Sequence, residues 1–170
     1  MNAESWLPVL LAAQGVMGGI DTLYNHEWVE HLPRRPSARR EIGLHSLREA
    51  NYGAIFIGLG WFEWHGALAW VIAAALAAEV LITAIDEFVE NKTRVLPQNE
   101  RVLHVFLTLN LGLILALAVP TLSGWSAQPT GLEGVPRGAL TGLLTLLGLS
   151  GFAWCVRDAL AWRRLGSPAA

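Results

Sequence analysis

Apolar residues occur in long runs along the chain, and these runs predict membrane-spanning helices. A bilayer core about 30 Å thick requires roughly 20 apolar residues of helix. The runs lie at residues 6–20, 52–64, 66–85, 102–122 and 139–156. The first reaches membrane length when it continues through Tyr24, and the second when it is extended back to Leu44. We therefore expect five transmembrane helices, with four as the alternative if the first segment lies in the interface.

Proline and glycine residues mark the expected ends of these helices. The helices are predicted at about residues 5–32, 38–64, 66–91, 99–119 and 136–164. Pro33 is expected to end the first helix and Pro120 the fourth, because proline removes a helical hydrogen bond. Residues 123–135 are expected to form a loop, and no internal repeat is apparent. The predicted fold is all-α, a single membrane domain over residues 1–170 whose first four helices form a bundle with a polar cytoplasmic end.

The basic residues predict the orientation of these helices. With five spans, one side of the membrane carries all but one of the 12 basic residues. They are Arg34, Arg35, Arg39, Arg40, Arg48, Lys92, Arg94, Arg101, Arg157, Arg163 and Arg164. Only Arg137 lies opposite. Because positive residues concentrate on the cytoplasmic side, we expect the N-terminus outside and the C-terminus in the cytoplasm.

Composition excludes some classes of function. The chain is 53% hydrophobic and 15% charged, and its 12 basic residues nearly balance 14 acidic ones. Nucleic-acid binding needs a basic surface, so no nucleic-acid partner is expected. The single cysteine, Cys155, excludes an intrachain disulfide.

Histidine and carboxylate residues gather at the cytoplasmic ends of the first four helices. Four of the five histidines lie there: His26, His31, His45 and His104. Glu41, His45 and Glu49 are spaced by four and share one helix face. The first helix offers two faces, His26 with Glu30 or Glu27 with His31, and the spacing leaves open which of them turns inward.

Imidazole and carboxylate groups in a bundle core are the ligands of dinuclear metal sites. The candidate metal ligands are Glu27, His31, Glu41, His45, Glu49, Glu79, Asp86 and His104. Iron is the expected metal, with manganese or zinc as alternatives. Tyr52, one turn beyond Glu49, is a candidate catalytic relay for a proton or an electron.

An interfacial salt-bridge network is the competing interpretation of the same residues. Glu87 and Glu90 are expected to be solvated beside Lys92 and Arg94. Glu79 favours a functional site, because no basic residue is expected at its depth. Asp21 either caps a kink after Gly18-Gly19 or pairs with Arg48 or Arg101, and His65 is expected to lie in an interfacial turn.

The polar residues from Asp21 to Asn110 also carry a resemblance. The motifs are Asp21-x-x-Tyr24-x-His26-Glu27, Arg40-Glu41-x-x-x-His45-x-x-Arg48-Glu49, Trp64-His65-Gly66 and Leu96-Pro97-x-x-Glu100-Arg101-x-x-His104. This half of the chain resembles a group of small bacterial multi-pass membrane proteins without an assigned activity, which implies the bacterial inner membrane. More loosely, it is similar to membrane di-iron carboxylate oxidases, although Glu41-x-x-x-His45 differs from their Glu-x-x-His spacing.

The leading hypothesis is a membrane-embedded di-iron oxidoreductase that acts on a lipid-soluble substrate. A metal-dependent lipid hydrolase would use the same ligands with bound water as the nucleophile. A proton or divalent-cation transporter is a second class, with Glu79, Asp86 and His104 along its path. A non-catalytic membrane subunit or assembly factor is a third, with the last helix docking a membrane-protein partner.

Overall fold

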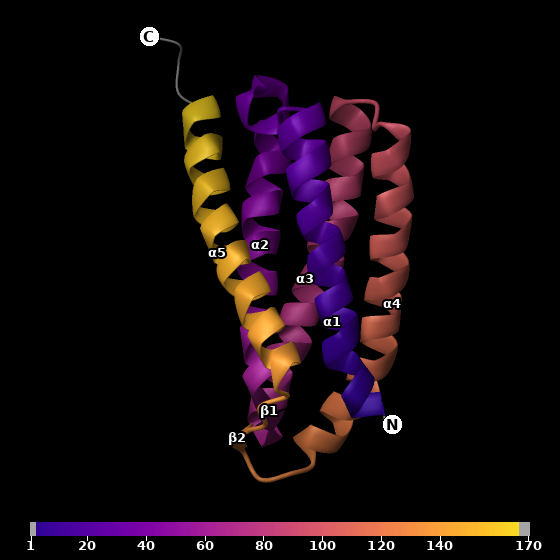
Figure 1. Ribbon diagram of the computed structural model, residues 1–170, viewed down its shortest axis with the longest axis vertical. Helices are drawn as coiled ribbons and strands as arrows, with labels where there is room; N and C mark the ends of the chain where they lie inside the picture. Colours follow the sequence, from indigo (N-terminus) through magenta and orange to yellow (C-terminus); the bar gives the residue numbers. More distant parts are fainter. Residues whose placement is uncertain (1–2, 167–170) are drawn as a thin grey trace.

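Five long helices make up most of the chain in the computed structural model, which describes residues 3–166. They are α1 (Ala3–Ile20), α2 (Arg39–Trp61), α3 (Ala69–Thr93), α4 (Gln98–Ser126) and α5 (Ala139–Leu165). All five run along the long axis of the molecule, and α5 leans against α2 (Figure 1). The expected all-α fold is confirmed.

Four helical segments of the described chain are long and apolar enough to cross a membrane. They are Trp6–Val29, Gly66–Thr93, Gln98–Ser126 and Ala139–Leu165. Helix α2 is not among them, because charged residues occupy its first half. Large apolar side chains such as Leu81, Phe106 and Leu146 point outward from three of these segments. An apolar outer surface of this kind is what contact with lipid requires.

An apolar core fills the section of the bundle between the buried ionisable residues and the sheet end. Leu11, Ile55, Ile114 and Leu144 are fully buried there, and they come from α1, α2, α4 and α5. Helical backbone satisfies most of its polar groups within each helix, which is a condition for burial in lipid. The core therefore holds these helices together, and the buried ionisable residues form a separate cluster at the other end of the bundle.

Glycine residues let α5 approach α2 closely. A Cβ atom added at Gly148 would lie 3.0 Å from the carbonyl oxygen of Gly53, and one at Gly151 would lie 2.9 Å from that of Glu49. Small residues at such positions allow two membrane helices to pack backbone to backbone. Helix α5 is thus a packed part of the bundle, with its other face exposed.

The first helix changes its geometry after Ile20. The α-helix ends there and continues as a π-helix, η1 (Asp21–Val29), which is followed by a 3₁₀ turn, η2 (Leu32–Arg34). The helix predicted over residues 5–32 is thus a continuous helical segment to Val29 whose type changes at Asp21. The wider π turn places residues five apart one above the other, so Asp21 and His26 face the bundle interior together. His31 lies just beyond, with a left-handed backbone (φ 51°).

A short sheet closes the opposite end of the molecule. Strand β1 (Phe62–His65) pairs antiparallel with β2 (Gly131–Gly134). The second predicted helix therefore ends at Trp61 instead of residue 64, and the predicted loop at 123–135 contains a strand. The expectation that Pro120 ends the fourth helix is also wrong, since α4 continues to Ser126. The fifth helix begins at Ala139, three residues later than expected.

Candidate metal centre

A cluster of buried ionisable side chains occupies the end of the bundle that carries η1 and the start of α2. It draws on four elements, which are η1, α2, α3 and the beginning of α4. Eight of its members are at most 6% exposed: Asp21, His26, Glu41, His45, Glu79, Asp86, Glu90 and Glu100. His104 joins them as a half-buried ninth. Burial of so many ionisable groups is costly unless they have partners or bind a cation.

Two aspartate–histidine pairs connect helices across the cluster. His45 Nε2 on α2 lies 3.2 Å from Asp86 Oδ2 on α3. His104 Nε2 on α4 lies 3.1 Å from Asp21 Oδ2 on η1. Each carboxylate therefore fixes the ring of a histidine on the neighbouring helix.

His26 lies between these pairs. Its Nε2 is 3.3 Å from Asp21 Oδ2 and 3.4 Å from Glu100 Oε1, and its ring stacks on His45 with centroids 4.5 Å apart. This buried nitrogen makes no hydrogen bond of acceptable geometry within the described chain. A ring nitrogen that faces two carboxylate oxygens without a hydrogen bond is suited to metal ligation.

Glu90 faces two histidines at once. One of its oxygens lies 3.9 Å from His45 Nε2, and the other lies 3.6 Å from His104 Nδ1. Its side chain is 1% exposed, so the expectation that Glu90 is solvated is wrong. Glu87, by contrast, has a side chain 58% exposed, as expected of a solvated residue.

Two groups within the cluster have the separations that a metal ion requires. Asp21, His26, Glu100 and His104 each offer one donor atom, and these four atoms lie within 4.8 Å of one another. The same holds for His26, His45 and Glu90. The two groups share His26, so they adjoin each other within the cluster.

Arg94 balances the carboxylates at the edge of the cluster. Its guanidinium donates to Glu41 Oε1 at 2.7 Å and to Glu100 Oε1 at 2.6 Å, and it lies 3.5 Å from Glu90. Burial alone would lower the pKa of Arg94, but the hydrogen bonds to Glu100 and Glu41 raise it above its usual value. The guanidinium therefore stays charged and holds two carboxylates from different helices.

Arg48 neutralises the deepest carboxylate. Its guanidinium lies 3.3 Å from Glu79 and 2.9 Å from Asp86. Asn51 and Thr83 donate hydrogen bonds to the same Glu79 carboxylate. The expectation that no basic residue lies at the depth of Glu79 is therefore wrong, because the long Arg48 side chain reaches it from α2.

The predicted ligands on the first helix lie away from the cluster. Glu27 forms an ion pair with Arg157 on α5. His31 is exposed, and its Nδ1 is 2.7 Å from the carbonyl oxygen of Glu27. The inward face of the first segment instead carries Asp21 and His26, and Glu30, the expected companion of His26, pairs with Arg35.

The other predicted site residues lie inside the bundle. Glu41, His45, Asp86 and His104 come together in the cluster, and Glu79 extends it toward the apolar core. The donor groups that the ligand prediction omitted are Asp21, His26, Glu90 and Glu100. One sequence signal for Glu100 was present, because Glu100 precedes His104 by four residues as Glu41 precedes His45.

A cavity of about 600 Å³ adjoins the cluster. Its polar wall includes His26, His45, Glu49 and Tyr52, and its apolar wall includes Phe56. The Tyr52 hydroxyl and Glu49 Oε2 are buried and make no hydrogen bond within the described chain. Other apolar residues of the wall include Leu23, Leu107, Leu111, Leu147 and Trp154.

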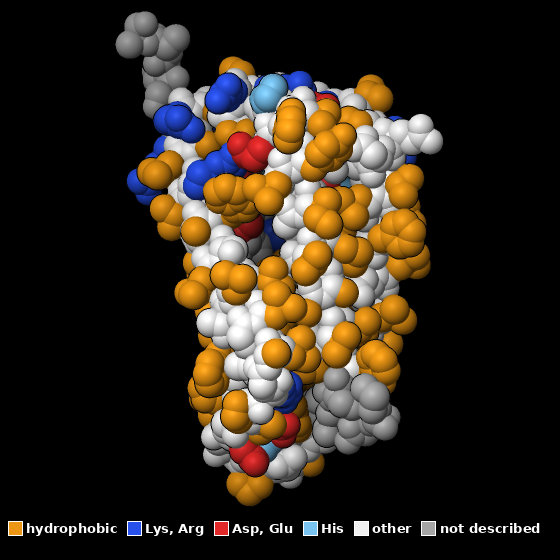
Figure 2. Space-filling model, in the orientation of Figure 1, with side chains coloured by type: hydrophobic (Ala, Val, Ile, Leu, Met, Phe, Trp, Pro, Cys, Tyr) orange, Lys and Arg blue, Asp and Glu red, His pale blue; other side chains and the backbone are white. Residues whose placement is uncertain are grey.

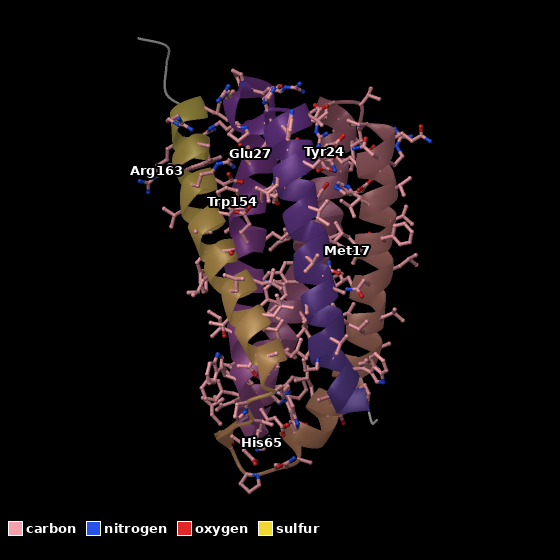
Figure 3. The ribbon with its side chains drawn as sticks, in the orientation of Figure 1. Met17, Tyr24, Glu27, His65, Trp154 and Arg163 are labelled. Atoms are coloured by element: carbon pink, nitrogen blue, oxygen red, sulfur yellow. The ribbon has the colours of Figure 1, made fainter. Side chains whose placement is uncertain are left out.

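The cavity reaches the lateral surface of the bundle. Figure 2 shows a hollow between α5 and α1, with acidic and basic side chains at its rim. Glu27 and Trp154 lie on either side of this gap, on η1 and α5 (Figure 3). A molecule entering there would come from the side of the bundle and meet the polar cluster at the inner wall.

A smaller polar group lies at the sheet end. His65 Nε2 is 3.5 Å from Glu63, and its Nδ1 is 3.9 Å from Glu133 on the paired strand. The ring also contacts Trp125 edge-on, and His65 is 8% exposed. His65 is therefore a buried contact between the sheet and α4, at the hairpin where a turn residue was expected.

Comparison of this chain with known protein families, with curated proteins and with solved structures finds no match.

Proposed function

We propose that this protein is a membrane-embedded metalloenzyme, a di-iron oxidoreductase that acts on a lipid-soluble substrate. The observation that carries the proposal is the convergence of three histidines and several carboxylates beside a lateral cavity. Manganese or zinc could occupy the same donors, but carboxylate-rich sites with imidazole ligands favour iron. A bound iron pair supplies electron transfer and activation of oxygen.

The charge balance of the cluster supports bound cations. Arg48 and Arg94 are the guanidinium groups within reach of its carboxylates, and these carboxylates outnumber them. Buried carboxylates without compensation would repel one another strongly. Divalent cations remove this repulsion, and the donor atoms of Asp21, His26 and His104 already lie close enough to share one.

The surrounding residues have distinct roles in this proposal. The carboxylates of Asp86 and Asp21 lie beside the rings of His45 and His104, so each pair would offer one carboxylate and one imidazole donor to an ion. Arg94 fixes the direction of the Glu100 carboxylate. Tyr52 holds its hydroxyl proton at the cavity wall, where the hydroxyl is placed to pass a proton to a substrate.

The cavity suits a substrate that dissolves in lipid. Its walls are mostly apolar side chains, and it opens sideways between η1 and α5. A quinone, an acyl chain or an isoprenoid would place its apolar part against Phe56 and Leu111 and its polar part toward His26. The membrane lipids are the source of such a substrate.

A transport function is less well supported. A path for ions across the membrane needs polar groups through its whole thickness. Apolar side chains of the core, including Leu11, Ile55 and Ile114, fill the section between the cluster and the sheet end.

We further propose five transmembrane helices in the bacterial inner membrane, with α2 as the fifth span. The polar cluster lies at the cytoplasmic end, the N-terminus outside and the C-terminus in the cytoplasm. Basic residues such as Arg39, Arg101 and Arg164 support this orientation. The exposed face of α5 is the surface on which a membrane-protein partner would dock.

Metal analysis tests the metal centre. The protein is purified in detergent without added metal, and iron, manganese and zinc are measured per chain by mass spectrometry. We expect iron in the wild type and a loss of at least about half of it in His45→Ala. The control, His31→Ala, alters an exposed histidine outside the cluster and is expected to keep its iron. A folded wild-type protein without bound metal would contradict the proposal.

A further inference from the structure

The second and fourth helices carry the same sequence motif. Helix α2 reads Glu-x-x-Leu-His-x₅-Asn-x-Gly from Glu41 to Gly53, and α4 reads the same from Glu100 to Gly112. The expectation that the chain has no internal repeat is therefore wrong. The repeat escapes a simple comparison because the connection before α2 is longer than the one before α4.

The helices that precede the two motifs also correspond. Each carries an Ile-Asp pair at its polar end, Ile20-Asp21 in one and Ile85-Asp86 in the other. A side chain of similar shape precedes each aspartate by seven residues: Gln14 before Asp21 and Glu79 before Asp86. A Leu-Pro pair follows the aspartate in both halves.

Contacts between helices repeat in the same way. The Asn51 side chain on α2 donates to Glu79 at 3.2 Å and to the carbonyl oxygen of Ala75 at 3.0 Å on α3. The equivalent Asn110 on α4 donates to Gln14 at 2.7 Å and to the carbonyl oxygen of Leu10 at 3.0 Å on α1. Each asparagine thus donates to one side chain on the partner helix and to the backbone carbonyl four residues before that side chain.

The ionisable pairs follow the same crossed pattern. His45 of the first hairpin meets Asp86 of the second, and His104 of the second hairpin meets Asp21 of the first. Glu41 and Glu100 occupy equivalent positions and converge on one guanidinium, that of Arg94. The contacts relate α1–α2 to α3–α4 by an approximate twofold axis along the bundle, and Arg94 lies near it.

We infer that the bundle is a tandem duplication of one helical hairpin and that its metal centre consists of two equivalent half-sites. Asp21 with His104 forms one half-site, Asp86 with His45 forms the other, and each binds one divalent metal ion. The inference rests on the proposed metal centre and adds to it the pairing of ligands across the hairpins. Neither hairpin alone holds a complete half-site, because each aspartate meets the histidine of the other hairpin.

Several positions break the symmetry and give the two half-sites different surroundings. His26 and Glu90 have asparagines, Asn91 and Asn25, at the equivalent positions of the other hairpin. His26 adds a donor beside Asp21, and Glu90 faces the histidines of both half-sites. Glu90 is therefore placed to bridge the two ions.

Arg48 is a further such position, since its equivalent on α4 is Leu107. Its guanidinium lies 2.9 Å from Asp86 and 3.3 Å from Glu79. The position equivalent to Glu79 in the first hairpin is the neutral Gln14. Arg48 and Glu79 thus form a local pair of opposite charges, and Arg48 contacts the same Asp86 oxygen, Oδ2, that His45 contacts.

Metal stoichiometry in paired variants tests the half-sites. The full chain in detergent is stripped with a chelator and reloaded anaerobically with iron(II), and iron per chain is measured after removal of the excess. We expect about two irons in the wild type and about one in each single variant: Asp21→Asn, His104→Gln, Asp86→Asn and His45→Gln. The double variant Asp21→Asn/His104→Gln should keep about one, because it removes a single half-site. His45→Gln/His104→Gln should keep none.

The outcomes separate this inference from the proposed function. A folded wild type that binds no iron contradicts the metal centre itself. If the wild type binds two irons but every single variant loses both, only the division into half-sites is contradicted. The half-sites are also contradicted if the chain binds one iron that is insensitive to His45→Gln, because the half-site beside Arg48 would then be empty. Circular dichroism and elution as a single species in gel filtration confirm that each variant is folded. If one variant of a half-site is not folded, the variant of the other residue in that half-site is used instead. His31→Gln is the control and should keep both irons.

Discussion

Arg94 is the residue on which the outer edge of the polar cluster depends. Its guanidinium contacts Glu41, Glu90 and Glu100, three buried carboxylates from three helices. Removal of one partner from a buried ion pair leaves the other charge uncompensated, which costs far more than loss of a surface pair. This residue therefore joins the two hairpins as well as balancing their charge.

Arg94→Gln is accordingly expected to lower the free energy of unfolding by about 3–5 kcal/mol. The measurement is helix loss, followed by circular dichroism, as a denaturing detergent is added to the protein in mild micelles. The control is Arg35→Gln, which removes the ion pair with Glu30 from an arginine side chain 44% exposed. That change should cost less than about 1 kcal/mol. Equal effects of the two substitutions would show that the Arg94 contacts do not stabilise the fold.

Residue spacing predicted part of the cluster. A step of four along a regular helix correctly brought Glu41 and His45 to one buried face. The same rule failed on the first segment, because the π-helix moves Asp21 and His26 inward and leaves His31 exposed. No local pattern shows that a helix will widen, so the period assumed for the spacing was wrong there.

The environment of single side chains was harder to predict than their spacing. Glu90 lies near Lys92 and Arg94 in sequence, which favoured a solvated salt bridge, yet it turns inward between two histidines. Glu79 gains Arg48 from another helix as a partner. Both errors arise because a charge partner comes from tertiary packing, which one helix cannot reveal.

At the scale of elements, the packing of α5 on α2 depends on glycine. The two helices approach so closely at Gly53, Gly148 and Gly151 that their backbones touch. Without a hydrophobic driving force between helices in lipid, this close packing is a main source of association. The sequence indicated a membrane helix at residues 136–164 but not which of its faces packs on α2.

Gly151→Ala tests this packing against a matched control on the same helix. The added Cβ atom would lie 2.9 Å from the carbonyl oxygen of Glu49, so α5 must shift. We expect a loss of stability of about 1–3 kcal/mol, as for other overpacked sites. Gly142→Ala, where no atom lies within 4 Å of the added Cβ, should be neutral or stabilising by up to about 1 kcal/mol. Thermal unfolding in micelles measures both, and equal shifts would contradict the close approach.

At the scale of the whole molecule, the expected membrane character is confirmed through four helices able to span a bilayer. The five-span topology and its orientation remain predictions from the basic residues. Ser37, in the turn before α2, and Gln128, after α4, are exposed and lie at opposite ends of the bundle. Positive charge near Ser37 predicts that it lies in the cytoplasm.

Cysteine labelling in intact cells tests the orientation. In a Cys155→Ala background, Gln128→Cys should react with a membrane-impermeant maleimide, and Ser37→Cys should react only after the cells are permeabilised. The unaltered Cys155→Ala protein is the control for background labelling. The reverse pattern would place the polar cluster on the outer side of the membrane.

The duplication of the hairpin also belongs to this scale. The motif around His45 and His104 is present in the sequence, but its meaning depends on the crossed contacts with Asp86 and Asp21. Charge and hydropathy vary around the motif, so neither pattern exposes it. The inference of a duplicated hairpin depends on the equivalent Asp–His and asparagine contacts among α1–α4.

X-ray absorption at the iron edge of the reloaded, detergent-purified protein is the most direct test of the proposed dinuclear centre. We predict imidazole and carboxylate ligation together with an iron–iron distance of about 3.5–4 Å. Glu90 faces both His45 and His104, so its carboxylate is placed between the two half-sites. A protein that retains no iron, or iron without a second iron at that distance, would contradict the account.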